Sequence, residues 1–237
     1  MKMEKIKLDE FYNIKGLSNL SYSKNGKNYA FVVSNINKDE DTYESYIYVG
    51  KGDNKYFKLT SFGKEGSYQF LDDDNIIFSG NRKPNKEEFG TKFYKINING
   101  GEAEEFLKFP INVVHVTALK NGDYLCLAYN NPLFENKKIL EDNKLVDEYK
   151  KYMKENNDYE EFSSIPFYMN GMGFIKGMKM SLYYYHTKDN KLDELTSIKH
   201  SVSSYEVNEE EDKVFVSIND DDKIISFHHD DMYAISL

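Results

Sequence analysis

Tight-turn signals recur along this chain at a nearly constant step, and this repeat constrains the fold more than any other feature of the sequence. The first set of markers is Gly26, Asp74 and Gly122, which lie 48 residues apart, each between two runs of strand-forming residues. A second marker keeps the step, because Gly52 is followed 48 residues later by Gly100. Each repeat therefore predicts four strands, joined in pairs by two hairpins.

The fourth repeat is displaced along the chain. Its first hairpin turn centres near Glu211, 89 residues after Gly122, which is one repeat plus about 41 residues. The extra residues form an insertion at about 132–172, after which residues 181–196 supply the second half of the third repeat. Four-stranded repeats of this length are typical of β-propeller blades.

We therefore predict an all-β chain, a partial β-propeller of about four four-stranded blades with a helical insertion in the third blade. The predicted organisation is a lead segment at 1–16 and a partial propeller at 17–237. The blades are expected at about 17–62, 66–108, 112–197 and 201–237.

The insertion contains the one stretch with a clear helical pattern, at 139–156. Leu145, Tyr149, Tyr152 and Met153 recur at helical spacing and share one face, while charged residues occupy the opposite face. We expect this helix to lie against the propeller. The glycine- and aromatic-rich residues 163–174 are expected to form a partly ordered loop.

Composition excludes several function classes. The 237 residues carry 31 Lys+Arg and 40 Asp+Glu, a net charge of -9, which argues against a nucleic-acid surface. Arg82 is the sole arginine, which excludes a phosphate clamp built from several guanidinium groups. Cys126 is the sole cysteine, so no internal disulfide and no thiolate-cluster metal site can form.

No apolar run approaches the roughly 18 residues of a membrane-spanning helix. The first 16 residues alternate charged and apolar side chains and lack the apolar stretch of a signal peptide. We therefore expect a cytoplasmic protein without a nucleic-acid or membrane partner.

Several polar features could carry chemistry, and the structural interpretation is favoured for each. Residues 228–231 (H-H-D-D) include metal-ligand types, but neighbours in a strand point to opposite faces. The acidic runs 72–74 and 220–222 lack the alternating ligands and the glycine of a calcium loop, which favours solvated turns. Gly171 and Gly173 lack the strand–turn–helix context of a dinucleotide site.

Two single residues remain to be weighed. Cys126 lies in an apolar predicted strand, where a buried structural thiol is the ordinary case. Arg82 lies at a strand end, where a structural salt bridge is favoured, and it stays open as a weak candidate for a substrate or domain-interface residue. We assign no catalytic, cofactor-binding or metal-binding residue, and we expect no cofactor.

Three segments resemble the propellers of the prolyl oligopeptidase family of serine peptidases. Residues 23–32 read S-K-N-G-K-N-Y-A-F-V and resemble a hairpin of that family, as do the strand end I-F-S-G-N-R at 77–82 and the turn Y-K-I-N-I-N-G-G-E-A at 94–103. The acylaminoacyl peptidases have the most similar pattern, because a blade-three insertion there ends in a glycine–aromatic segment like 170–174. That segment leads to a strand that closes in Leu-Thr, as Leu195 and Thr196 do here.

The resemblance covers nearly all of the chain from Leu17 onward, with one departure in composition. Propellers of this family normally carry tryptophans in their strands, whereas this chain has none and places Tyr and Phe there. Family members place a seven- or eight-bladed propeller before an α/β-hydrolase domain, so the chain resembles a fragment. The hydrolase nucleophile motif G-x-S-x-G does not occur in it.

The resemblance implies that the propeller restricts entry to a hydrolase active site, so that short peptides pass and folded proteins do not. The full-length protein is expected to hydrolyse short or N-acylated peptides with a Ser-His-Asp triad outside these residues, so the implied partners are an α/β-hydrolase domain and short peptides. An alternative is a stand-alone propeller that acts as a binding scaffold, like the TolB-type modules.

About four blades cut from a larger ring would leave the outer faces of the two terminal blades open. Exposed apolar patches larger than about a few hundred Å² are normally buried by association with another molecule. We therefore expect self-association through the terminal blades near 20–33 and 214–237, with closure into a four-bladed ring as the alternative.

Overall fold

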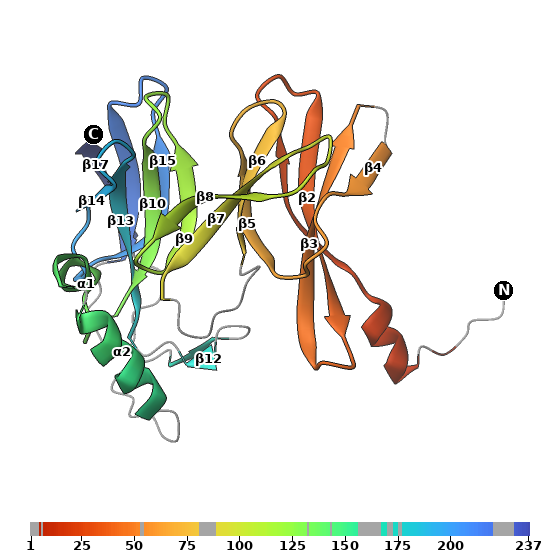
Figure 1. Ribbon diagram of the computed structural model, residues 1–237, viewed down its shortest axis with the longest axis horizontal. Coiled ribbons are helices and arrows are strands. Elements are labelled where there is room, and N and C mark those ends of the chain that lie inside the picture. Colours follow the sequence, from red (N-terminus) through yellow and green to blue (C-terminus); the bar gives the residue numbers. More distant parts are fainter. Residues whose placement is uncertain are drawn as a thin grey trace. The chain divides into compact units, whose positions relative to one another are not determined.

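The computed structural model describes residues 5, 7–52, 55–80, 89–131, 133–142, 144–155, 167–169, 173–174, 177–219 and 230–237. The chain divides into two compact units, the first made of Met1–Glu88 and Lys92–Lys108 and the second of Phe89–Thr91 and Phe109–Leu237. Each unit contains two antiparallel sheets of three or four strands, and the second unit also contains a two-stranded pair (Figure 1). Among the described residues, no helix is both long and apolar enough to cross a membrane.

The first unit holds the 3₁₀ helix η1 (Leu8–Asn13) and two four-stranded sheets whose strands follow chain order. The first sheet consists of β1 (Gly16–Tyr22), β2 (Asn28–Asn37), β3 (Thr42–Lys51) and β4 (Lys55–Lys58). The second sheet consists of β5 (Glu65–Phe70), β6 (Asn75–Gly80), β7 (Thr91–Asn97) and β8 (Glu104–Phe109).

The second unit holds the third and fourth sheets. The third sheet consists of β9 (Val113–Ala118), β10 (Tyr124–Asn130), β13 (Lys179–His186) and β14 (Lys191–Glu194). Between β10 and β13 lie α1 (Asn136–Glu141), α2 (Lys144–Glu155) and the small pair β11 (Tyr168–Met169) and β12 (Gly173–Phe174). The fourth sheet, as far as the structure describes it, consists of β15 (Ser201–Val207), β16 (Lys213–Asn219) and β17 (Asp230–Ser236).

These four successive sheets confirm the predicted all-β fold of four propeller blades with a helical insertion in the third. We call the sheets the first to fourth blades. The predicted hairpin at Gly26 joins β1 to β2, and the one at Gly122 joins β9 to β10, both as antiparallel pairs.

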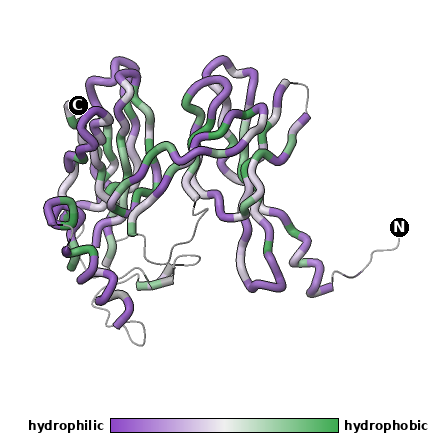
Figure 2. Tube along the Cα trace, in the orientation of Figure 1, coloured by the Kyte–Doolittle hydropathy of each residue, from purple (hydrophilic) through white to green (hydrophobic). Residues whose placement is uncertain are grey.

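Within each unit the two blades bury a hydrophobic core between facing sheets. In the first unit, Ala30, Val32, Ile47 and Val49 of the first blade pack against the second blade, which contributes Tyr68, Ile76, Phe78, Tyr94, Ile96 and Ile98. In the second unit, the third blade contributes Leu119, Leu125, Leu127 and Leu182, which pack against Val202, Val214, Val216 and Ile218 of the fourth. Figure 2 shows the apolar residues concentrated in the strands and the polar residues in the turns.

Hydrogen bonds between neighbouring blades join residues about one repeat apart. Ser21 Oγ donates to the Tyr68 hydroxyl at 3.0 Å, over a separation of 47 residues. In the second unit the corresponding contact joins Thr117 Oγ1 and the Tyr205 hydroxyl at 2.8 Å, over 88 residues, because the insertion lies between them. Equivalent positions of the sequence repeat therefore make equivalent hydrogen bonds between the two blades of each unit.

Two blades close with the same Leu-Thr pair. Thr60 Oγ1 accepts a hydrogen bond from the Ile47 N–H at 2.9 Å, and Thr196 Oγ1 accepts one from the Leu182 N–H at 2.8 Å. In each case the short outermost strand ends before it reaches the donor, so the threonine replaces a missing strand contact. Both threonines are buried, where an unsatisfied N–H would be costly.

The structure corrects the prediction of one helix at 139–156. Two helices form instead, because α1 ends at Glu141 and α2 begins at Lys144. Between them Asp142 adopts an extended conformation (φ -138°), and its Oδ1 accepts a hydrogen bond from the Lys144 N–H at 3.0 Å. A short acidic side chain that binds the backbone in this way favours a helix start over a helix interior.

The predicted apolar face of the second helix is nevertheless confirmed at Tyr149, whereas the side chain of Met153 lies outside the described residues. Tyr149 is buried, and its ring lies 5.2 Å from that of Phe89 and 5.1 Å from that of Phe134. The charged residues predicted for the other face are exposed: Lys144, Asp147, Glu148, Lys151 and Lys154. The loop predicted at 163–174 falls mostly outside the described residues.

One extended feature was not predicted from the sequence. The hairpin of β2 and β3 continues as a two-stranded ribbon to Asn37 and Thr42. Polar cross-strand contacts support it, since the amides of Asn35 and Asn37 both donate to the Glu44 carboxylate, at 3.3 and 2.8 Å.

Candidate functional site

The candidate site lies beside the helical insertion of the third blade, and a buried polar network fixes its position. Asn130, at the end of β10, donates from Nδ2 to Ser181 Oγ at 3.2 Å and to the Tyr183 hydroxyl at 3.1 Å. Its Oδ1 accepts a hydrogen bond from the Asn136 N–H, the first residue of α1, at 2.9 Å. Asn136 in turn donates to the Tyr129 carbonyl at 2.8 Å.

All four network side chains are almost fully buried, with exposed fractions of 0 to 3% for Asn130, Asn136, Ser181 and Tyr183. Burial raises the pKa of Tyr183 to about 12, so its hydroxyl stays protonated. The network therefore ties α1 to the middle of the blade. This network was not predicted from the sequence, although the amide of Asn130, two residues after the apolar run 124–128, was an available signal.

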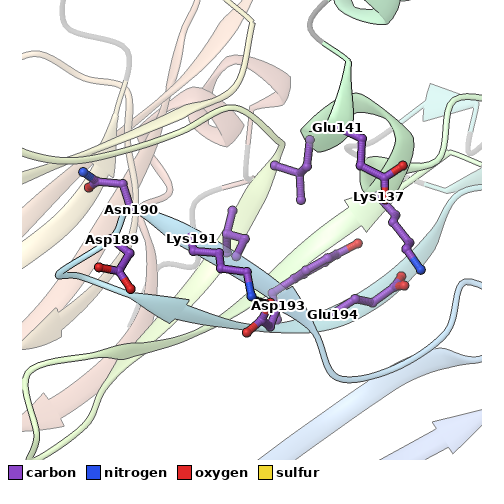
Figure 3. Close-up of a pocket in the computed structure, with 10 residues that line it drawn as sticks. Lys137, Glu141, Asp189, Asn190, Lys191, Asp193 and Glu194 are labelled. Carbon is purple, nitrogen blue, oxygen red and sulfur yellow. Dashed lines mark ion pairs between the residues drawn. The ribbon is translucent and has the colours of Figure 1, made fainter.

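A groove of about 760 Å³ opens between α1 and the hairpin of β13 and β14 (Figure 3). Helix α1 contributes Lys137, Leu140 and Glu141 to its lining. The hairpin contributes Tyr183, Asp189, Asn190, Lys191, Leu192, Asp193 and Glu194. Tyr183 thus joins the groove to the buried network.

The groove is predominantly acidic, with four carboxylates and two lysines in its lining. Lys191 Nζ lies 2.7 Å from Asp193 Oδ1, and this contact is the main reason that the pKa of Asp193 is lowered. Burial raises the pKa of Glu194, with Lys137 opposing that effect and Glu135 adding to it. The groove can therefore attract cationic groups, and its walls are supplied by two rigid elements.

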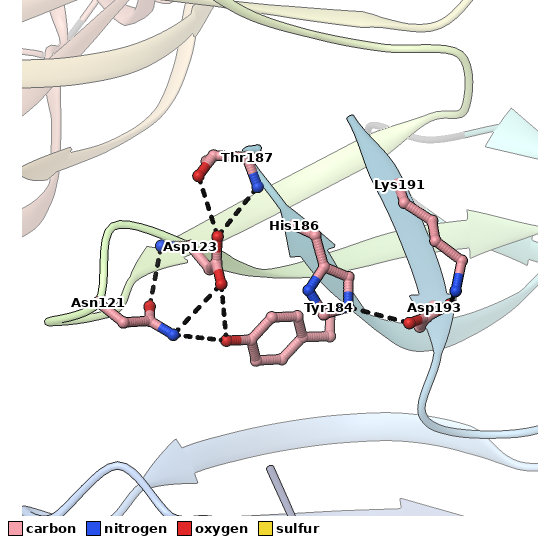
Figure 4. Close-up of polar contacts among 7 residues, drawn as sticks. All are labelled: Asn121, Asp123, Tyr184, His186, Thr187, Lys191 and Asp193. Atoms are coloured by element: carbon pink, nitrogen blue, oxygen red, sulfur yellow. Dashed lines mark hydrogen bonds and ion pairs between the residues drawn. The ribbon is translucent and has the colours of Figure 1, made fainter. Parts of the chain in front are cut away.

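A second polar cluster lies at the turn end of the same blade (Figure 4). Asp123 accepts hydrogen bonds from the Thr187 N–H and Oγ1, both at 2.9 Å, and from the Tyr184 hydroxyl at 3.0 Å. The Asn121 amide donates to both the Tyr184 hydroxyl and Asp123. These bonds, led by the one from the Thr187 N–H, lower the pKa of Asp123. The cluster ties the two hairpin turns of the blade together.

One pair in this region has the geometry of a base and its orienting carboxylate. His186 Nε2 lies 2.9 Å from Asp193 Oδ2, and the Tyr184 ring lies 4.5 Å from the imidazole. The nearby hydroxyls of Tyr184 and Thr187 already donate to Asp123, so neither is arranged to lose its proton to His186. Within the part of the chain that the structure describes, neither of these two hydroxyls is thus paired with His186 as a nucleophile with its base.

A smaller hollow of about 460 Å³ lies between the first strands of the third and fourth blades. Its lining residues are His115, Thr117, Leu127, Ser204, Tyr205, Glu206 and Val207. Burial lowers the pKa of His115, with Glu206 opposing that effect, and burial raises the pKa of Tyr205. At neutral pH this hollow presents an uncharged imidazole and a protonated phenol.

The one candidate site residue from the sequence, Arg82, lies outside the described residues, as do 220–222, 171–172 and His228 and His229. Neither the salt bridge nor the substrate role considered for Arg82 is therefore tested. Among the residues that the structure does describe, no three His, Cys, Asp or Glu side chains gather in a way that could hold a metal ion.

Two other sequence interpretations can be assessed directly. Cys126 is fully buried in the sheet, and burial raises the pKa of its thiol well above the usual range, which confirms a structural role. Asp72 accepts hydrogen bonds from the N–H groups of Asp74 and Asn75, and Asp73 Oδ1 accepts one from the Asn25 N–H. The acidic run at 72–74 forms a turn, as predicted, and its carboxylates accept hydrogen bonds from backbone N–H groups of this turn and of the hairpin turn at Asn25.

Comparison with known proteins identifies the fold. No protein-family model matches the chain, and no curated protein sequence matches it. Among solved structures, the Pyrococcus horikoshii acylaminoacyl peptidase matches 95% of this chain with a TM-score of 0.60 at 14% identity. An acylaminoacyl peptidase in complex with Z-Gly-Gly-Phe-chloromethyl ketone matches 95% with a TM-score of 0.56 at 16% identity. A putative TolB from Agrobacterium tumefaciens matches 94% with a TM-score of 0.50 at 9% identity.

Identities this low show the fold alone. The chain has a β-propeller fold similar to those of acylaminoacyl peptidase and the putative TolB. It spans 31 and 32% of the length of the two peptidases and 58% of the TolB protein.

Proposed function

We propose that this chain is part of the propeller of a serine peptidase of the acylaminoacyl peptidase type, where it controls which peptides reach a separate catalytic domain. The observation that carries the proposal is the match of 95% of the chain to an acylaminoacyl peptidase of which it spans 31%. The hairpin and turn motifs at 23–32, 77–82 and 94–103 support the same assignment independently of the fold comparison.

The chemistry of the described residues supports a role in access. The sole thiol, Cys126, is buried and protonated, and the hydroxyls near His186 donate to Asp123. The sequence also has no G-x-S-x-G motif. In this proposal the Ser-His-Asp triad lies in an α/β-hydrolase domain outside these residues.

Selection by size would follow from the rigidity of the blades. Within each unit, the two neighbouring blades share a hydrophobic core and hydrogen bonds such as Ser21–Tyr68 and Thr117–Tyr205. A passage bounded by such blades admits short or N-acylated peptides and excludes folded proteins, and it keeps bulk water from the catalytic domain. A cytoplasmic location, without nucleic-acid or membrane partners, belongs to the same proposal and agrees with the net charge of -9.

The direct test is to determine the coding sequence downstream of Leu237 and to treat the full-length product with a fluorophosphonate probe. We expect an α/β-hydrolase domain with G-x-S-x-G and covalent labelling of its serine. The 237-residue chain, purified alone, is the matched control and should neither be labelled nor hydrolyse acyl-peptide chromogenic substrates. Labelling of the isolated chain, abolished by a substitution within it, would refute the proposal.

A binding scaffold of the TolB type is the second candidate function, favoured by the match to the putative TolB from Agrobacterium tumefaciens. It predicts a coding sequence that adds further blades and then stops without a hydrolase domain. The same experiment therefore separates the two functions.

A further inference from the structure

The groove beside α1 follows the free edge of the third blade. β14 is the outermost strand of that sheet, and within the part of the chain that the structure describes it pairs with β13 alone. Leu192 and Glu194 project from one face of β14 and Asp193 projects from the other, because side chains alternate along a strand. All three residues line the groove. The groove therefore runs along the edge of the strand and is not confined to one face of the sheet.

The backbone of β14 has the geometry needed to accept one more strand. The Leu195 N–H donates to the Leu182 carbonyl at 2.8 Å, so the backbone groups of Leu195, and two residues earlier those of Asp193, are directed toward β13. Alternation directs the N–H and C=O groups of Leu192 and Glu194 away from β13, toward the free edge. Among the described residues, these outward groups have no hydrogen-bond partner. An extended peptide can pair with them as an added strand.

Helix α1 supplies a second wall at a fixed position. Its first residue, Asn136, is held by the bond from its N–H to the buried Asn130 side chain at 2.9 Å. From this fixed start, Lys137, Leu140 and Glu141 extend along the groove. A wall that is already in place reduces the entropy lost when a ligand binds.

The lining suits a side chain that has an apolar stem and a cationic end. Leu140, Leu192 and the ring of Tyr183 supply apolar surface, while the Tyr183 hydroxyl belongs to the buried network. Figure 3 shows Glu141 on the helical wall and Glu194 on the strand wall. Within the described part of the chain, neither carboxylate forms a hydrogen bond or an ion pair. Lysine and arginine side chains combine a long apolar stem with a terminal positive charge.

The two lysines of the groove leave its negative charge largely uncompensated. Lys191 is already paired with Asp193, at 2.7 Å. Burial raises the pKa of Glu194, and Lys137 opposes this effect whereas Glu135 adds to it. The pKa stays raised in spite of Lys137, so a further cation beside Glu194 would stabilise its charged form.

We propose that the groove between α1 and β14 binds an extended peptide that pairs with the edge of β14 and places a lysine or arginine side chain between Glu141 and Glu194. Both walls belong to the third blade, so the site is complete within one blade. The site is additional to the proposed control of access to a catalytic domain, and its test needs no such domain.

The first experiment measures peptide binding to the purified 237-residue chain by fluorescence anisotropy. The probe is a fluorescein-labelled Thr-Val-Lys-Val-Thr peptide, and the matched control peptide has glutamine in place of lysine. We expect saturable binding of the lysine peptide and a dissociation constant about fivefold or more higher for the glutamine peptide, as for loss of an ion pair near the surface. A third peptide, methylated on its backbone nitrogens, keeps the charge but cannot donate backbone hydrogen bonds. It should bind about tenfold or more weakly.

The second experiment separates the groove from the net charge of -9. A Glu141→Gln/Glu194→Gln variant should raise the dissociation constant of the lysine peptide by about fivefold or more. The matched control is Asp147→Asn/Glu148→Gln, which changes the net charge equally on the exposed face of α2 and should leave binding unchanged. Circular dichroism verifies that both variants are folded.

Four outcomes would overturn the proposal. They are no saturable binding of the lysine peptide, equal affinity for the lysine and glutamine peptides, full affinity for the methylated peptide, and equal weakening by the two double variants. The last of these would show attraction to the charge of the whole chain and not to the groove.

Discussion

The buried network around Asn130 leads to the most demanding prediction, for the substitution Asn130→Ala. The Asn130 amide makes three hydrogen bonds inside the third blade, to Ser181, Tyr183 and the N–H of Asn136. Alanine removes all three and leaves the Asn136 N–H, at the start of α1, without that acceptor. The substitution therefore tests whether this network attaches the insertion to the blade.

The expected loss follows from burial. Each of the two hydrogen bonds that Asn130 donates contributes about 1 kcal/mol, and a buried N–H left unsatisfied costs about 1–2 kcal/mol more. The total is about 3–4 kcal/mol. With a denaturant dependence of about 2 kcal/mol per molar urea, the unfolding midpoint of the second unit should fall by about 1.5–2 M.

The matched control is Asn121→Ala at the exposed hairpin turn. Asn121 also makes three hydrogen bonds, two donated to Asp123 and Tyr184 and one accepted from the Asp123 N–H. Because water can replace these exposed hydrogen bonds, Asn121→Ala should lower the unfolding free energy by less than about 1 kcal/mol. Urea unfolding followed by tyrosine fluorescence measures both variants. Equal losses for Asn130→Ala and Asn121→Ala would refute the reasoning.

Three further predictions follow from single side chains. Tyr149→Asp should destabilise the second unit by about 3 kcal/mol or more, because it removes a buried ring and buries a charge. The exposed control Lys151→Asp should cost less than about 0.5 kcal/mol. Thermal unfolding measures both variants, and equal shifts in their melting temperatures would contradict the helix register. The pKa of Asp123 is lowered from 3.8 in the folded chain, so the carboxylate stabilises the fold fully above pH 3.8 and loses this contribution as the pH falls through the folded-state pKa. In this acidic range, Asp123→Asn should therefore reduce the dependence of the unfolding free energy on pH. An unchanged dependence would argue against the hydrogen bonds to Asp123. The buried thiol of Cys126 should react with a disulfide reagent only after unfolding, and rapid labelling of the native chain would exclude its buried position.

Much of the fold could be predicted from the sequence because it depends on local chemistry. Gly26 and Gly122 both have positive φ angles, of 71° and 89°, which glycine adopts without strain, so the hairpins could be located from residue type alone. Strand alternation and the 48-residue step then gave the order of the blades. The break at Asp142 was missed because the extended conformation of that residue, and a single bond from the Lys144 N–H to its side chain that begins the second helix, leave no mark on the apolar pattern.

The candidate site depends on contacts that no local pattern encodes. Asp123 accepts a hydrogen bond from Thr187, 64 residues away, and Asn130 donates one to Ser181, 51 residues away, across the insertion. The groove between α1 and β14 exists only because that network fixes the start of the helix. Arg82, the residue chosen from the sequence, lies outside the described residues, so its role stays a prediction.

The sequence by itself determined that both faces of the strand at 28–37 carry apolar side chains, since Phe31 lies between Ala30 and Val32. Only the tertiary structure decided which face is covered: Ala30 and Val32 are buried, whereas the face that contains Tyr29 and Phe31 also carries the exposed rings of Tyr22 and Tyr56. The physical reason is that the hydrophobicity of a side chain follows from its residue type, whereas its burial depends on which other residues pack against it. A repeat specifies which type of face each strand presents, and the number and order of the blades specify whether another blade is there to cover it.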